Sequence, residues 1–357
     1  MTNKINVAVL FGGRSVEHKV SLQSAKNVVE NIDREKHNVM LIGIDPNGKW
    51  HFYDEQSYLF NEDNPEAISL GKSIREVDLR KESIDVVFPV LHGTFGEDGT
   101  VQGLLRLYDL PFVGAGVLGS AVGMDKDVAK RLIRDAGIAT PNFLAIEEHN
   151  ISYEKVQEML TPPYFIKPAR SGSSIGINKA TNEQEFISAL DSAFTFDRKV
   201  LIEEAIAGVE LQFALLGNKV SLPCQIIPKA EMHSYASKYL DPDGAEWLIP
   251  APLSDKLLSS AQEMALKAYQ VLCCGGMARV DLFLSEEGEL YFNEINTLPG
   301  LTRQSPYAKM WEATGVSFTD VLDRLIQLAL DRHKKDGRLN THLEDSGLLS
   351  GGFSIAP

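Results

Sequence analysis

The sequence predicts an α/β protein of several domains, with a doubly wound parallel sheet in its N-terminal part. Apolar runs of strand length alternate with helical patterns over the first 122 residues. Polar, glycine-rich loops follow two of these runs, at residues 12–18 and 92–99. A βαβ rhythm of this kind favours parallel strands with functional loops at their carboxyl ends. The length of 357 residues, 44% of them hydrophobic, suits two or three domains.

The elements can be assigned in order along the chain. In the N-terminal part we expect a helix at 20–32 and strands at 5–11, 39–45, 84–91 and 111–113. A second unit should hold helices at 127–136 and 182–193 and strands at 164–168, 176–179, 199–203 and 210–216. In the third, Ser254 should cap a helix at 255–272, and Ser317 with Asp320 should form a capping box before a helix at 318–335. The predicted domains are therefore 1–122, 123–215 and 216–337, followed by a flexible polar tail, 338–357.

Composition excludes several classes of function. The net charge of −14 argues against general binding of nucleic acid or acidic membranes. The three cysteines lack metal-ligand spacing, so we expect reduced thiols. The apolar stretches are shorter than the ~20 residues of a transmembrane helix. These features predict a cytoplasmic protein without a nucleic-acid or membrane partner.

A predicted hairpin near the C-terminal end carries a candidate metal site. Two strands, 278–284 and 289–296, are joined by a turn that contains Gly288. Pairing them places Asp281 opposite Glu294 and Arg279 opposite Asn296, with all four side chains on one face because side chains alternate. Carboxylate and amide oxygens suit a hard cation such as Mg²⁺. The alternative is a solvent-facing polar stripe, but the rigid turn at 297–300 favours a nucleotide-phosphate site.

A second candidate site is a loop rich in serine and glycine between two strands, residues 169–176. Lys167 precedes it, and the backbone N–H groups and hydroxyls of such a loop, including Ser174, can close over phosphate oxygens. Alone, such a loop is usually a hairpin turn. A strand ending in acids follows, whose carboxylates can accept from ribose hydroxyls while the backbone near Ile206 pairs with adenine; the acids are Glu203, Glu204 and Glu210.

Together, these segments resemble the D-alanine–D-alanine ligases of the ATP-grasp superfamily. The resemblance runs from residue 5 to about residue 330, in the order of the family. It rests on Phe11-Gly-Gly-Arg-Ser-Val-Glu17-His18, His92-Gly-Thr-Phe-Gly, Met124-Asp-Lys126, Lys167-Pro through Gly176, Tyr235-Ala-Ser-Lys238-Tyr239, Arg279-Val-Asp281 and Asn293-Glu-Ile-Asn-Thr-Leu-Pro-Gly300. It implies a three-domain ATP-grasp architecture, a homodimer, and ATP-dependent synthesis of D-alanyl-D-alanine for peptidoglycan through a D-alanyl phosphate.

The resemblance also assigns roles to residues. A pair of Mg²⁺ (or Mn²⁺) ions would be held by Asp281, Glu294 and Asn296. ATP would be bound with the help of Lys126 and Lys167. Arg279 and the N–H of Gly300 would form an oxyanion site, a device worth ~3 kcal/mol per donor.

Further roles concern the two D-alanine substrates. Glu17 and His92 would hold the first, and Lys238 and Ser305 would receive the carboxylate of the second. Glu17, Ser173 and Tyr239 would form a hydrogen-bonded cluster that closes a mobile loop, 230–242, and Tyr239 favours an amine over D-lactate as the nucleophile. The sequence departs from the family pattern at the rim of the second-substrate pocket, at Arg303, Gln304 and Pro306.

Three other functions compete with this interpretation. Another ATP-grasp carboxylate–amine ligase would keep the hairpin and the lysines but not Glu17 or His92. A catalytically silent nucleotide-binding regulator would be favoured by loss of Arg279 or a metal ligand, and none is lost. A dehydrogenase would rest on Gly12 and Gly13 alone, which lack the spacing of a dinucleotide fingerprint.

Overall fold

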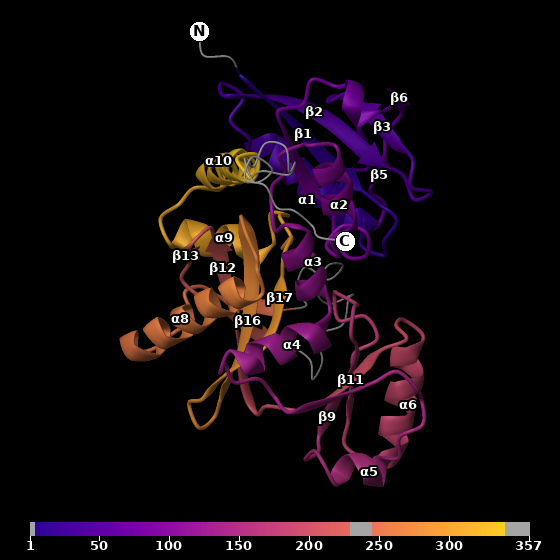
Figure 1. Ribbon diagram of the computed structural model, residues 1–357, viewed down its shortest axis with the longest axis vertical. Helices are drawn as coiled ribbons and strands as arrows, with labels where there is room; N and C mark the ends of the chain where they lie inside the picture. Colours follow the sequence, from indigo (N-terminus) through magenta and orange to yellow (C-terminus); the bar gives the residue numbers. More distant parts are fainter. Residues whose placement is uncertain (1–3, 229–244, 340–357) are drawn as a thin grey trace, which may run out of the picture.

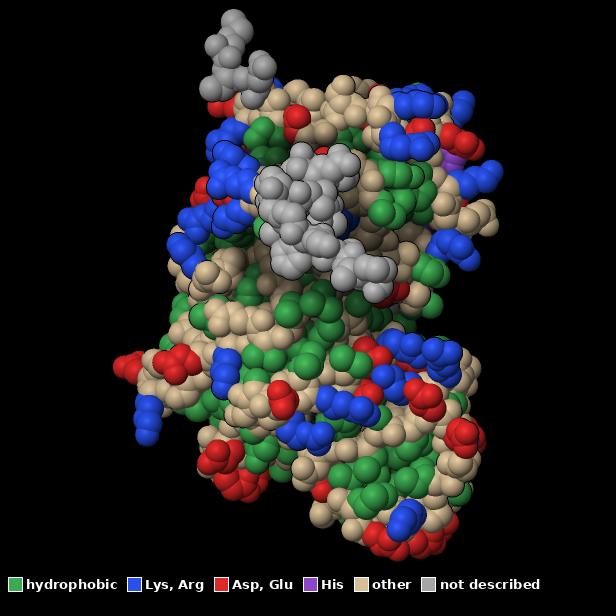
Figure 2. Space-filling view, viewed as in Figure 1, with side chains coloured by type: hydrophobic (Ala, Val, Ile, Leu, Met, Phe, Trp, Pro, Cys, Tyr) green, Lys and Arg blue, Asp and Glu red, His purple; other side chains and the backbone are tan. Residues whose placement is uncertain are grey.

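Three sheets carry the fold of this protein (Figure 1). The computed structural model describes residues 4–228 and 245–339. The predicted mobile loop, 230–242, and the tail from residue 340 onward lie outside the described residues. None of the helices in the described residues has the length and hydrophobicity that spanning a membrane requires. Figure 2 shows acidic and basic side chains interspersed over one face, with acidic groups gathered at the end that carries α5 (Tyr153–Gln157).

The N-terminal sheet has a parallel centre with helices on both faces, which confirms the doubly wound prediction. Its order is β6-β3-β2-β1-β7, in which β2-β1-β7 are parallel: β1 (Ile5–Gly12), β2 (His37–Ile44) and β7 (Val86–Val90). Side chains of β1 alternate between two cores. Val7, Val9 and Phe11 pack in the core that holds α1 (His18–Asn31), whereas Ala8 and Leu10 pack in the core that holds α2 (Thr100–Leu107).

Two details of this sheet differ from the sequence prediction. Residues 111–113 form no strand, only an isolated bridge between Phe112 and Val87. Two antiparallel strands, β3 (Trp50–Tyr53) and β6 (Ser73–Glu76), extend the sheet beyond β2 and were not expected. Short segments of weak pattern complete this part: β4 (Leu59–Phe60), β5 (Ser69–Leu70) and a 3-10 turn at Leu79–Lys81.

The central sheet is antiparallel and has a core of its own. Its order is β10-β9-β11-β8, with bounds β8 (Phe143–Ile146), β9 (Tyr164–Pro168), β10 (Asn178–Ala180) and β11 (Val200–Glu204). Helices α5 and α6 (Glu183–Phe194) supply side chains such as Val156 and Phe186 to this core. Figure 1 shows the sheet and its helices set apart from the rest of the molecule.

The third sheet contains the predicted hairpin, β16 (Met277–Ser285) and β17 (Leu290–Asn296). Its order is β15-β14-β12-β16-β17, with β13 paired to β12; the remaining strands are β12 (Gly208–Leu216), β13 (Lys219–Val220), β14 (Cys224–Pro228) and β15 (Ala245–Leu248). One core joins it to α4 (Lys126–Asp135) and α8 (Asp255–Val271). Helix α3 (Val117–Met124) leads into α4 and also contacts β17.

The last two helices tie the third sheet to the N-terminal sheet. Side chains of α9 (Pro306–Ala313) and α10 (Phe318–Asp336) share one core with β1, β7, β12 and β16. The expected cap of α10 is present, because Ser317 Oγ accepts from the backbone N–H of Asp320 at 3.1 Å. Arg332 of α10 donates to the carbonyl oxygen of Phe112 at 2.6 Å. The first and third sheets therefore form one packed body, and the central sheet packs separately.

Candidate functional site

The predicted hairpin pairs as the sequence indicates. Arg279 lies opposite Asn296, and Asp281 lies opposite Glu294. Arg279 donates two hydrogen bonds to the carboxylate of Asp281, from Nε to Oδ1 and from Nη2 to Oδ2, both at 2.7 Å. Gln212 of β12 also donates to Asp281 Oδ2, at 3.3 Å. Burial raises the pKa of Asp281 to about 6, although the charge of Arg279 opposes the shift.

Lys126 connects the hairpin to the serine-rich loop. Its Nζ donates to the carbonyl oxygen of Ser171 at 2.8 Å and lies 3.3 Å from Glu294 Oε2. The loop itself is tightly curled, because Ser173 (φ 54°) and Ser174 (φ 58°) both adopt the left-handed conformation that side chains rarely take. Turns of this type can aim backbone N–H groups at an anion. The loop that the sequence suggested for phosphate therefore lies beside the candidate metal strand.

Ser173 also reaches the N-terminal sheet. Its hydroxyl donates to Glu17 Oε1, which is buried at the start of α1. Gly93 (φ 72°) passes so close that a Cβ atom there would lie 2.5 Å from Glu17 Oε2. Glu17 and Ser173 thus meet as the resemblance implies, while Tyr239 and Lys238 lie outside the described residues.

The imidazole ring of His92 is buried and neutral. Its Nδ1 lies 3.1 Å from the carbonyl oxygen of Leu298, and its Nε2 lies 2.9 Å from Ser24 Oγ. Burial lowers the pKa of His92 to about 4. Because the carbonyl of Leu298 can only accept, Nδ1 carries the proton and Nε2 accepts from Ser24.

The acids that the sequence suggests for nucleotide binding lie in different surroundings. Glu203 is 1% exposed and its two oxygens lie 2.8 Å from Lys167 Nζ and 2.7 Å from Lys130 Nζ. It is therefore engaged inside the protein, unlike the open strand-end acid that the sequence suggested. Glu204 is partly exposed and accepts from Asn142 Nδ2 at 2.8 Å. Ile206 follows β11 in the connection to β12, and Glu210 lies on β12 opposite Phe283.

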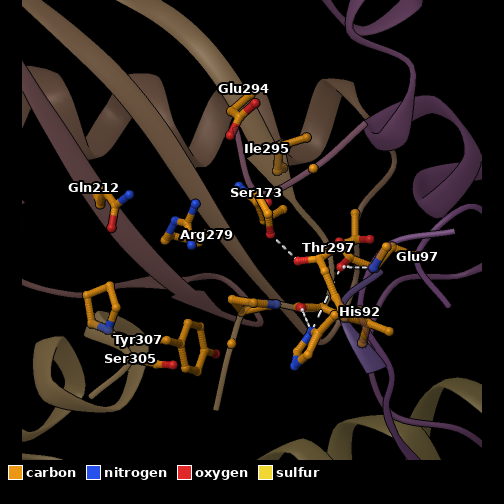
Figure 3. Close-up of a pocket in the computed structure, with 18 of the residues that line it drawn as sticks. His92, Glu97, Ser173, Gln212, Arg279, Glu294, Ile295, Thr297, Ser305 and Tyr307 are labelled. Carbon is orange, nitrogen blue, oxygen red and sulfur yellow. Dashed lines mark hydrogen bonds and ion pairs between the residues drawn. The ribbon is translucent and has the colours of Figure 1, made fainter. Parts of the chain in front are cut away.

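A cavity of about 110 Å³ brings together nine of the sixteen sequence-predicted residues that lie in the described part of the chain. Figure 3 shows Arg279 and Glu294 among its lining residues, with Ser173, His92 and Ser305 arriving from other segments. The predicted residues that line it are Glu17, His92, Lys126, Ser173, Arg279, Glu294, Asn296, Gly300 and Ser305. Those outside the lining are Lys167, Ser174, Glu203, Glu204, Ile206, Glu210 and Asp281.

Gly300 and Ser305 lie together at one end of this cavity. A Cβ atom at Gly300 would lie 2.8 Å from Ser305 Oγ, so only glycine leaves the backbone this close to the hydroxyl. Ser305 Oγ lies 2.9 Å from Thr302 Oγ1 and accepts from the N–H of Thr302 at 3.1 Å. Of the departures from the family pattern, Gln304 and Pro306 line the cavity, whereas Arg303 turns outward to Glu30 at 2.7 Å.

Sequence reasoning missed three residues of the cavity and its surroundings. Gln212 lines the cavity and could have been found, because it lies two positions after Glu210 on the same strand face. Glu97 belongs to the glycine-rich loop at 92–99; burial and the charge of Glu17 raise its pKa to about 8. Lys130 follows Lys126 by one helical turn, but its burial at 0% exposure has no signal in the sequence.

The hairpin offers carboxylate and amide oxygens to a cation. The described residues contain no cluster of three His, Cys, Asp or Glu side chains placed to hold a metal ion. Asp281 and Glu294 supply carboxylate oxygens and Asn296 an amide, which is chemistry that Mg²⁺ accepts. Neighbouring carboxylates, among them Glu294, contribute to the raised pKa of Asp281. Because a cation would relieve this repulsion, the donor set fits one.

This fold and this pocket define an ATP-grasp ligase, in which a serine-rich loop faces an oxygen-rich hairpin. Family models narrow the class. The model described as the D-ala D-ala ligase N-terminus matches residues 6–115, and the model described as the C-terminus matches residues 132–327. The chain belongs to the D-alanine–D-alanine ligase family.

Individual relatives agree with this family over nearly the whole chain. A D-alanine–D-alanine ligase of Shouchella clausii is 48% identical, covering 96% of this chain and 99% of its own length. D-alanine–D-alanine ligase A of Escherichia coli K12 is 46% identical, with 95% and 99% covered.

Solved structures show the same fold. The D-alanine–D-alanine ligase of Coxiella burnetii has a TM-score of 0.81 at 34% identity, covering 97% of this chain and 99% of that one. The VanG D-Ala:D-Ser ligase of Enterococcus faecalis has a TM-score of 0.77 at 36% identity, with 92% and 100% covered. A Bacillus anthracis ligase complexed with ATP has a TM-score of 0.75 at 27% identity, with 93% and 100% covered.

Proposed function

We propose that this protein joins two molecules of D-alanine, with ATP, to give D-alanyl-D-alanine, ADP and phosphate. The observation that carries the proposal is the position of Lys126, whose ammonium contacts both the phosphate loop at Ser171 and the metal strand at Glu294. Lys126 therefore links the loop proposed for phosphate with the strand proposed for the metal ions. The dipeptide is a precursor for peptidoglycan, and a cytoplasmic location and a homodimer belong to the same proposal.

In the first step, a carboxylate oxygen of the first D-alanine attacks the γ-phosphorus of ATP, giving D-alanyl phosphate and ADP. Glu17 is the acceptor for the ammonium group of this D-alanine, since it is the buried carboxylate that lines the cavity beside Ser173. His92 is neutral and supports this wall through Leu298 and Ser24. Catalysis of phosphoryl transfer consists mainly of positioning and charge stabilisation, which Lys126 and Lys167 provide.

In the second step, the amine of the second D-alanine attacks the carbonyl carbon, and phosphate leaves with the bridging oxygen. The tetrahedral intermediate carries a negative oxygen. Arg279 and the N–H of Gly300 are the donors for it, and both line the cavity. Ser305, at the same end, receives the carboxylate of the second D-alanine together with Lys238, and Tyr239 closes the cluster at Glu17 and Ser173. Closure keeps water from the acyl phosphate.

Asp281, Glu294 and Asn296 would hold the pair of Mg²⁺ or Mn²⁺ ions. Bound there, the ions neutralise charge on the triphosphate. The protein already balances these carboxylates with its own cations, since Arg279 pairs with Asp281 and Lys126 lies near Glu294. Glu204, Ile206 and Glu210 would contact the ribose and adenine, and Ser174 would contact phosphate through the curled loop.

Purified protein supplied with Mg²⁺, ATP and D-alanine should release phosphate and form a D,D-dipeptide, identified by mass. Parallel reactions should contain L-alanine, or D-alanine with D-serine or D-lactate. L-Alanine should give no product, and D-lactate should react more slowly than D-alanine at neutral pH. Release only when D-serine or D-lactate is added would reject D-alanine as the second substrate and point to Gln304 and Pro306. No release with any D-amino acid, despite ATP binding, would reject the ligase reaction.

A further inference from the structure

A buried lysine outside the residues assigned above lies at the junction of the central and third sheets. Lys130, on α4, is 0% exposed. Its Nζ lies 2.7 Å from Glu203 Oε2 on the central sheet. It also donates to Thr140 Oγ1 at 2.9 Å and lies 3.5 Å from the carbonyl oxygen of Phe292 on β17. Thr140 Oγ1 in turn donates to the same carbonyl at 2.9 Å.

The ammonium of Lys130 donates hydrogen bonds to Thr140 Oγ1 and to the carbonyl oxygen of Phe292, and it forms an ion pair with Glu203. Lys167 differs. Among residues 4–228 and 245–339, its Nζ has two acceptors, Glu203 Oε1 at 2.8 Å and Asn293 Oδ1 at 3.5 Å. One hydrogen of Lys167 is therefore available for a ligand.

The charges of the three buried groups do not cancel. Lys130 and Lys167 carry two positive charges against the single negative charge of Glu203. Burial lowers the pKa of Lys130 to about 8, with the charge of Glu203 opposing the shift, so the ammonium stays protonated at neutral pH. Lys130 and Lys167 outweigh the effect of burial on Glu203 and lower its pKa, so it stays ionised.

We propose that Lys130 is a positioning residue for the nucleotide: it shares Glu203 with Lys167, so that Lys167 keeps a net positive charge for the polyphosphate. Without Lys130, Lys167 and Glu203 would form a neutral pair, and the buried site would lose the excess charge that attracts phosphate. Because interactions between buried charges are weakly screened, the loss should be felt at the nucleotide. This inference rests on the proposed nucleotide site and adds a residue that touches no substrate.

The test compares ADP binding, measured by calorimetry with Mg²⁺, in four forms of the full chain. Lys130→Met removes the charge but keeps the length and apolar stem of the side chain, and should weaken ADP binding about tenfold or more. Lys130→Met combined with Glu203→Gln restores one net positive charge and should recover most of the lost affinity. Thr140→Val removes the two hydrogen bonds of this hydroxyl, to Lys130 and to Phe292, without changing the charge, and should change the affinity less than threefold.

The recovery separates a charge effect from a structural one. If Lys130 only holds the fold, the double variant should bind ADP no better than Lys130→Met and should melt at a lower temperature. That result, or unchanged ADP binding in folded Lys130→Met, would overturn the inference. If the unaltered chain makes the dipeptide and Lys130→Met binds ADP normally, the role of Lys130 is rejected and the proposed function stands. If the unaltered chain binds no ADP, the nucleotide site and the inference fall together.

Discussion

The central sheet and the N-terminal sheet are stabilised in different ways. Among the described residues, the core of the central sheet is formed only by the sheet and by the segments that carry α5 and α6, from Val156 to Ile202. The core of the N-terminal sheet is shared with α9, α10 and the third sheet. One part of the molecule is therefore a separately packed unit, and the other, here the fixed body, is formed by segments far apart in the sequence.

Polar contacts, rather than a shared apolar core, join the two parts at the pocket. Ser173 of the central part donates to Glu17 at the start of α1, and Lys126 and Lys130 each contact both the central part and β17. Hydrogen bonds and ion pairs can be exchanged for contacts to a ligand at little cost, whereas a close-packed core resists displacement. We therefore expect the site to adjust around its substrates along the boundary between the central part and the fixed body. This boundary is the seam.

The largest effect on the catalytic rate should come from a residue of the fixed body, Arg279. Arg279→Ala removes a proposed oxyanion donor and leaves Asp281 buried without its two-point partner. We expect kcat to fall about 1000-fold, since one such donor is worth ~3–4 kcal/mol. Arg279→Lys keeps the charge but loses the two-point contact, and should fall less. Steady-state rates of phosphate release measure both; an alanine variant within tenfold of the unaltered enzyme would contradict the role.

A second change tests whether the central sheet unfolds separately. Phe186 is 1% exposed and packs against Tyr153 and Tyr164, with ring centroids 5.4 and 6.3 Å away. Phe186→Ala should destabilise this core by about 3 kcal/mol. Hydrogen exchange should then rise in β9, β10 and β11 and stay slow in β1 and β16.

The matched variant is Trp311→Ala on the fixed body, where Trp311 is 1% exposed. It should accelerate exchange in the N-terminal and third sheets together, because they share that core. Equal acceleration in all three sheets for both variants would show a single cooperative unit and remove the contrast.

The stability of the fixed body should depend on pH through His92. Its pKa is about 4 in the folded protein, against 6.5 for an ordinary histidine. As pH falls from about 6.5 to about 4, His92 is protonated in the unfolded chain but stays neutral in the folded protein. The free energy of unfolding therefore falls by up to about 3 kcal/mol. Denaturant unfolding across this range should show a steeper loss for the unaltered protein than for His92→Gln. Identical slopes would mean that His92 does not titrate in this way.

The smallest effect should come from one contact across the seam. Ser173→Ala deletes the hydrogen bond to the Glu17 carboxylate. A hydrogen bond to a charged group is worth about 1.5–3 kcal/mol, so kcat/KM for D-alanine should fall at least tenfold. Ser192→Ala, on the distant helix α6, is the control and should leave the rate unchanged. A Ser173→Ala enzyme with normal kcat/KM would remove this contact from the closing of the site.

The pairing of neighbouring strands was easier to predict from the sequence than the packing between distant segments. Period-two alternation was enough to pair Asp281 with Glu294, and the αβ rhythm was enough for β1, β2 and β7. Neither pattern shows that α10 packs on the N-terminal sheet, because that contact joins residues more than 200 positions apart, as between Arg332 and Phe112. The domain boundaries at 122 and 215 stay predictions.

Burial was the other property that sequence could not supply. Glu203 reads as an acid at the end of a strand and Lys130 as a helical lysine, yet both are buried and paired. A charged residue is usually exposed unless it has a partner, and the partner here comes from another element. The residue types along each strand and loop were therefore apparent from the sequence, whereas the network that sets their charge required the fold.

The central chemical claim is that a D-alanine carboxylate is activated as an acyl phosphate at this seam. D-Alanine labelled with ¹⁸O in its carboxylate tests it directly, in a reaction with Mg²⁺ and unlabelled ATP. We expect one ¹⁸O atom per dipeptide in the released phosphate, because the bridging oxygen leaves with phosphorus. Dipeptide formed with unlabelled phosphate would contradict it.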